Sequence, residues 1–147
     1  MTRFAATTLA PVLLLLAAAG WGGVWIWLAL AYLTLLVFAL DRLGGLAAPG
    51  DPGTAFPAGT TLSAALGLIH FPLLALAVLV VAGQTGATWP ERAAAYLAFG
   101  LFLGQVGNSN AHELIHRADR RLRRLGVAVY ASVLYGHHAS AHPLVHH

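Results

Sequence analysis

Apolar residues run through this chain in four long stretches, separated by shorter segments rich in glycine, proline and charge. A helix needs about 20 predominantly apolar residues to cross the hydrocarbon core of a bilayer, and each stretch approaches that length. We therefore predict an all-α integral membrane protein, a bundle of about four transmembrane helices. The predicted spans are Phe4–Ala19, Gly23–Leu40, Leu62–Ala82 and Arg92–Asn110.

Two breaks in this pattern predict loops. The stretch Gly44–Gly59 holds three prolines and several glycines, a composition typical of a loop and not of a membrane span. The second break is Gly83–Pro90. Thr88 and Glu91 have the spacing of a capping box, which predicts that the fourth span begins directly behind them.

The composition agrees with a bilayer protein, because 59% of the 147 residues are hydrophobic and only 9% are charged. Soluble domains carry about a quarter charged residues. All 8 basic residues are arginines, and such residues collect on the cytoplasmic side of a membrane. Arg3, Arg42 and an arginine cluster after the last span therefore place both termini in the cytoplasm, with Arg92 alone opposite. The cluster is Arg117, Arg120, Arg121, Arg123 and Arg124.

The segment after the last span predicts an amphipathic helix. Arg117–Leu125 carries Leu122 and Leu125 as its apolar side, and we expect it to lie along the cytoplasmic surface of the cell membrane. The arginines favour a membrane surface over nucleic acid. Val127–Leu134 is apolar but too short to cross. We expect one membrane domain over residues 1–147.

The candidate chemistry lies near the C-terminus, where seven of the 8 histidines fall between His112 and His147. His112 and His116 are four residues apart, so on a helix they differ by about 40° and both imidazoles can reach one metal ion. The chain has no cysteine, so a metal site must use histidine and carboxylate. We predict that His112 and His116 are metal ligands.

A second histidine cluster repeats this spacing. His142 and His146 are four residues apart and His147 follows directly; His137 and His138 are further candidate ligands. Five imidazoles exceed what one zinc ion takes, whereas all-nitrogen ligation with open positions suits iron. His138 is also four residues before His142, so the spacing alone does not fix which of these histidines bind the metal.

Other polar residues are candidates to line the site of His112 and His116 or to orient their imidazoles. Gln105, Asn108 and Ser109 share an arc of about 100° with the histidines, which predicts a polar stripe along the fourth span. Gln105 is equally consistent with hydrogen bonding between helices. Glu113, Asp119 and Asn108 are candidates to orient a ligating imidazole, although carboxylates beside arginines also form simple surface pairs.

Three further residues within the spans are placed outside the site. His70 stands alone near the middle of the third span; such a histidine is a functional candidate by default, and a hydrogen-bonded packing role is equally consistent. Gly100 and Gly104 have the spacing of small residues at helix–helix contacts. We expect both glycines to pack against a neighbouring helix.

The segment Asn110–Arg117 (N-A-H-E-L-I-H-R), followed by Tyr135-Gly136-His137 and then His142-x-x-x-His146-His147, resembles the membrane alkane monooxygenases of the fatty-acid desaturase/hydroxylase superfamily. The resemblance implies a helical membrane enzyme with two non-haem iron ions facing the cytoplasm. It implies hydroxylation of alkane or fatty acyl C–H bonds, with dioxygen as co-substrate and electrons from a rubredoxin or ferredoxin. The resemblance implies that the iron ligands are His112, His116, His142, His146 and His147.

The chain departs from the family pattern at several positions. Ala141 stands where the family commonly has glutamate, Val145 where it has glycine, and His138 where an aromatic residue is usual. The family also has a third histidine box and two further spans, so the chain resembles an N-terminal portion of such an enzyme. We expect that these 147 residues alone do not hydroxylate a substrate.

Three alternative functions are weighed against the hydroxylase. A fatty acid desaturase of the same superfamily shares the histidine pattern and differs in pocket shape. His112-Glu113-Leu114-Ile115-His116 also satisfies the H-E-x-x-H pattern of zinc metalloproteases, with Glu113 as general base, but the second cluster has no place in that mechanism. A non-enzymatic membrane metal-binding or transport protein is disfavoured because every motif lies at one membrane face.

Overall fold

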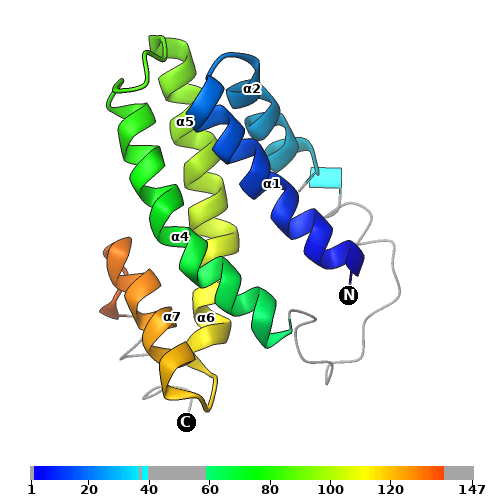
Figure 1. The fold of residues 1–147 in the computed structure, drawn as a ribbon, viewed down its shortest axis with the longest axis vertical. Helices are drawn as coiled ribbons and strands as arrows, with labels where there is room; N and C mark the ends of the chain where they lie inside the picture. Colours follow the sequence, from blue (N-terminus) through cyan, green and yellow to red (C-terminus); the bar gives the residue numbers. More distant parts are fainter. Residues whose placement is uncertain (1, 37, 40–58, 138–147) are drawn as a thin grey trace.

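Every regular element in the described part of the chain is helical (Figure 1). A computed structural model describes residues 2–36, 38–39 and 59–137. The predicted all-α class is confirmed. The elements are α1 (Thr2–Trp21), α2 (Val24–Ala31), the π-helix η1 (Tyr32–Leu36), α4 (Thr60–Val81), α5 (Trp89–Leu101), the π-helix η2 (Phe102–Gly107), α6 (Asn108–Ile115) and α7 (Arg120–Ser132).

Two helical hairpins form the main bundle. Helices α1 and α2 are joined at Gly22 and Gly23, whose φ angles of 61° and 54° allow a reversal that other residues rarely adopt. Helix α4 packs against α5, and α1 and α2 pack against this second pair. Helix α5 continues through η2 into α6, and α7 then folds back against α6 and α4 (Figure 1).

The core of the bundle is built from apolar residues of α1, α2, α4, α5 and η2, among them Leu15, Ile26, Leu73 and Phe99. Large apolar side chains also cover parts of the outside; Leu13 and Leu68, for example, are 68% and 64% exposed. Helices that are apolar both inside and outside are typical of a bilayer protein. By length and composition, α4 is the one helix in the described ranges that is long and apolar enough to cross a membrane.

The start of α5 confirms the predicted capping box. The backbone N–H and the hydroxyl of Thr88 both donate to Glu91 Oε2, each at 2.7 Å. These hydrogen bonds favour the charged carboxylate and hold the pKa of Glu91 below its ordinary value. Arg92 Nε donates to the Val81 carbonyl oxygen at 2.7 Å, which ties the start of α5 to the end of α4.

Helix α7 differs from the predicted surface helix in two ways. It begins after Asp119, which caps it by accepting a hydrogen bond from the Arg121 N–H at 2.7 Å, and it runs on through most of the apolar stretch predicted separately as Val127–Leu134. Val129 and Tyr130, which pack with Ala111 and Ile115 of α6, are also buried. The location of this helix along the membrane surface stays a prediction.

Candidate metal site

His112 and His116 lie next to each other at the end of α6. Their ring centroids are 4.7 Å apart and the ring planes are tilted by 59°. His112 is half-buried, and His116, the C-cap of the helix, is exposed. The predicted shared face of one helix is confirmed, and both imidazoles can reach a single ion from it.

The opposite face of α6 fixes the direction of the histidine pair. Ala111 and Leu114 on that face are fully buried, and Gly126 of α7 packs directly against them. A Cβ added at Gly126 would lie 2.8 Å from Leu114 Cβ and 2.9 Å from the Ala111 carbonyl oxygen. Because the two helices approach this closely, that face of α6 lies against α7, and the face shared by His112 and His116 lies on another side of α6.

Hydrogen bonds on the inner side hold α6 to its neighbours. Asn110 is buried, and its Nδ2 donates to the Ser63 carbonyl oxygen of α4 at 2.9 Å. The Tyr130 hydroxyl of α7 donates to the Asn108 carbonyl oxygen at 3.5 Å. The sequence motif includes Asn110 without indicating its role, which is to anchor the helix that carries the histidines.

The two carboxylates predicted to orient the ligands have partners of their own. Glu113 forms an ion pair with Arg117 at 2.7 Å, one helical turn away. Asp119 caps α7. Both carboxylates thus have a partner close by in the sequence, as expected if they serve only the local structure. Their predicted role in orienting an imidazole stays a prediction.

The polar stripe predicted on the fourth span is altered by a π-helix. The segment η2, Phe102–Gly107, winds more residues into a turn than an α-helix, so the 100° step used to place Gln105 does not apply through it. Asn108 and Ser109 lie in α6 itself and are exposed, as is Gln105. π-Segments inside α-helices are frequent at functional sites, and this one directly precedes the histidine pair.

The second histidine cluster lies outside the described residues, which include none of His138, Ala141, His142, Val145, His146 or His147. His137 is described, and its ring centroid is 4.7 Å from that of Tyr135. Within residues 2–36, 38–39 and 59–137, no group of three or more His, Asp or Glu side chains could hold a metal ion. The structure thus brings together two of the predicted ligands, His112 and His116, whose nitrogen donors fit part of an iron site.

His70 has a clear packing role. The side chain is only 2% exposed, and its Nε2 lies 2.9 Å from Ser132 Oγ of α7. Since the Ser132 hydroxyl donates to the Val129 carbonyl oxygen at 2.7 Å, it accepts the Nε2–H of His70. His70 Nδ1 is buried without a hydrogen-bond partner among the described residues and faces Gly107, where an added Cβ would lie 3.0 Å away.

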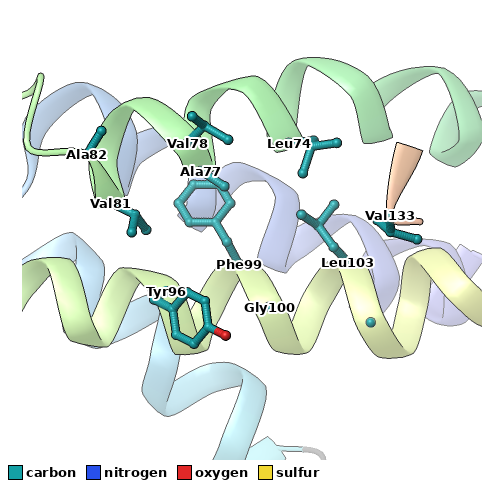
Figure 2. Close-up of a pocket in the computed structure, with 11 residues that line it drawn as sticks. Leu74, Ala77, Val78, Val81, Ala82, Tyr96, Phe99, Gly100, Leu103 and Val133 are labelled. Atoms are coloured by element: carbon teal, nitrogen blue, oxygen red, sulfur yellow. The ribbon is translucent and has the colours of Figure 1, made fainter. Parts of the chain in front are cut away.

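The glycines predicted to pack against a helix do not do so. A Cβ added at Gly100 or Gly104 would meet nothing within 4 Å in the described structure, so that prediction is wrong for this chain. Both glycines line an apolar groove of about 720 Å³ between α4 and the α5–η2 helix (Figure 2). The other lining residues are Leu74, Ala77, Val78, Val81, Ala82, Tyr96, Phe99, Leu103 and Val133.

Comparison with protein-family models, with curated proteins and with solved structures finds no match to this chain. A functional assignment therefore has to come from the residues and their geometry.

Proposed function

We propose that this protein is a membrane-bound, non-haem di-iron oxygenase that hydroxylates alkane or fatty acyl C–H bonds. The observation that carries the proposal is the pair of imidazoles on the outer face of α6, whose ring centroids are 4.7 Å apart. A half-buried and an exposed histidine in contact at the end of one helix are well placed to bind a metal. The chain lacks cysteine, which excludes thiolate ligands.

In this proposal His112 and His116 hold iron through imidazole nitrogen, and His142, His146 and His147 supply further ligands. Bound iron supplies the activation of dioxygen. Imidazole ligation with open positions suits iron chemistry of this kind. The electrons come from a cytosolic rubredoxin or ferredoxin, since both termini are proposed to face the cytoplasm of a multi-pass inner-membrane protein.

The apolar groove supports a hydrocarbon substrate. Its volume of about 720 Å³ is in the range of ligand pockets, and the described lining side chains are hydrocarbon apart from the Tyr96 hydroxyl. At one end it reaches Val133, four residues before His137. The groove residues would hold an alkyl chain and keep water away from it.

The Glu113–Arg117 ion pair disfavours the metalloprotease alternative. A general base in an H-E-x-x-H site must contact metal-bound water, whereas the Glu113 carboxylate in this structure is held by Arg117 at 2.7 Å.

Metal content tests the proposal. Elemental analysis of the purified protein should find iron, with occupancy reduced in both His112→Ala and His116→Ala and retained in His70→Gln, which removes a histidine outside the pair. In membranes from cells that express the gene, any alcohol formed from a medium-chain alkane with reduced rubredoxin should require both histidines. Stoichiometric zinc without iron, with peptide cleavage lost in Glu113→Gln, would establish the protease instead.

A further inference from the structure

The outer face of α7 carries a basic pocket that the proposed oxygenase chemistry does not use. Arg120, Arg123, Arg124 and Val127 line a hollow of about 400 Å³. Their spacing of three, four and seven residues places all four on one side of the helix. Arg121, in the same turn, is not part of the lining.

The three arginines of this pocket have no anionic partner among the described residues. The nearby carboxylates are engaged: Glu113 pairs with Arg117, and Asp119 caps α7. Positive charge in the first turns of a helix also opposes the helix dipole, which favours anions there. The arrangement therefore carries an electrostatic cost that a bound anion would offset.

Packing holds this basic face outward. On the opposite side of α7, Gly126 is in close contact with α6, and Val129 and Tyr130 are buried. Because that side is packed, the arginine-bearing side of α7 is left on the outside, where Arg120, Arg123 and Arg124 are exposed.

Apolar surface continues from the arginines along α7. Val127, inside the basic pocket, is 40% exposed, and Leu134 just beyond the helix is 92% exposed. Two contacts show how α7 runs along α4. Leu125 lies against Gly67 of α4, where an added Cβ would meet it, and Ser132 forms a hydrogen bond with His70 near the middle of α4. The helix thus leads from its arginine end toward the middle of the predicted span, and Val133 lines the apolar groove there.

We propose that this face of α7 binds an anionic phospholipid of the surrounding bilayer, with its phosphate at Arg120, Arg123 and Arg124 and an acyl chain over Val127 and Leu134. The inference rests on the proposed membrane location. An acidic protein would match the arginines but not the exposed apolar residues that continue from them, so the combined surface favours a lipid.

The test is a lipid titration of the full chain in neutral detergent. Phosphatidylglycerol should bind saturably and phosphatidylcholine should not. Arg123→Gln and Arg124→Gln should each weaken phosphatidylglycerol binding about fivefold, the effect of one arginine at an anionic membrane surface. Arg121→Gln is the matched control, an exposed arginine outside the pocket, and should weaken binding less than twofold. Val127→Asn should weaken binding with every charge intact.

Three results would overturn the lipid site. Equal losses for Arg121→Gln and Arg123→Gln would mean diffuse attraction. Binding of a polyglutamate peptide with the same arginine dependence, unaffected by Val127→Asn, would indicate an acidic protein partner. Insertion into phosphatidylcholine bilayers without saturable phosphatidylglycerol binding would reject this site and leave the membrane proposal standing, whereas failure to insert into any bilayer would reject both.

Discussion

The inner and outer faces of α6 differ in how their residues are held. On the inner face, Ala111 and Leu114 pack directly on Gly126, and Asn110 is hydrogen-bonded to α4. On the outer face, the rings of His112 and His116 contact each other at the end of the helix. His112 is half-buried and His116 is exposed. A substitution on the inner face leaves a cavity in the core or overpacks it. Replacing an outer histidine by alanine leaves the core unchanged.

His70 extends the same comparison to histidine itself. It is buried, bonded to Ser132 and packed on Gly107, so its position is explained by the joining of α4 to α7. His112 and His116 lie instead at the rim of α6, where His112 is half-buried and His116 is exposed, and their role as metal ligands stays a prediction.

The largest expected effect is at the inner face. Gly126→Ala should destabilise the protein by about 3 kcal/mol, the upper end of the overpacking range, because one atom that its Cβ would meet belongs to the backbone at Ala111. Gly100→Ala, the same change where nothing lies within 4 Å, should be neutral or stabilising by up to about 1 kcal/mol. Unfolding in mixed detergent micelles measures both. A free energy of unfolding for Gly126→Ala equal to that of Gly100→Ala would show that α6 and α7 are not closely packed.

A smaller effect is expected at His70. His70→Ala removes the hydrogen bond to Ser132 and leaves a cavity, which should cost about 2 kcal/mol without lowering the iron content. His112→Ala is the matched substitution on the outer face and should change the free energy of unfolding by less than about 0.5 kcal/mol. The same unfolding measurement decides it. A large loss of stability in His112→Ala would mean that the outer pair is structural.

Local patterns in the sequence predicted local structure well. The capping box at Thr88 and Glu91 formed as predicted, and the four-residue spacing of His112 and His116 gave two neighbouring rings, because both depend only on the geometry of one helix. The four apolar stretches are helical over their described residues except at the ends Gly23 and Ala82. The number of membrane crossings is a proposal, since among the described helices only α4 meets the length and hydropathy criteria.

Contacts between distant segments were not predictable from the same patterns. The Gly100–Gly104 spacing indicated helix packing, whereas the close contact is at Gly126, because spacing does not say which face of a helix a neighbour covers. Ser132, the partner of His70, is 62 residues away in the chain. The π-helix before α6 has no periodic signature, so the predicted position of Gln105 relative to the histidines was not reliable.

The central claim is that His112 and His116 bind iron through their imidazoles. X-ray absorption at the iron edge of the iron-loaded protein tests it most directly, because imidazole ligands give a distinct multiple-scattering signal. We expect this signal in the wild-type protein and in His70→Gln, and a clear loss of both signal and bound iron in the His112→Ala/His116→Ala double variant. An iron environment unchanged by the double substitution, or a wild-type shell of oxygen ligands alone, would contradict the claim.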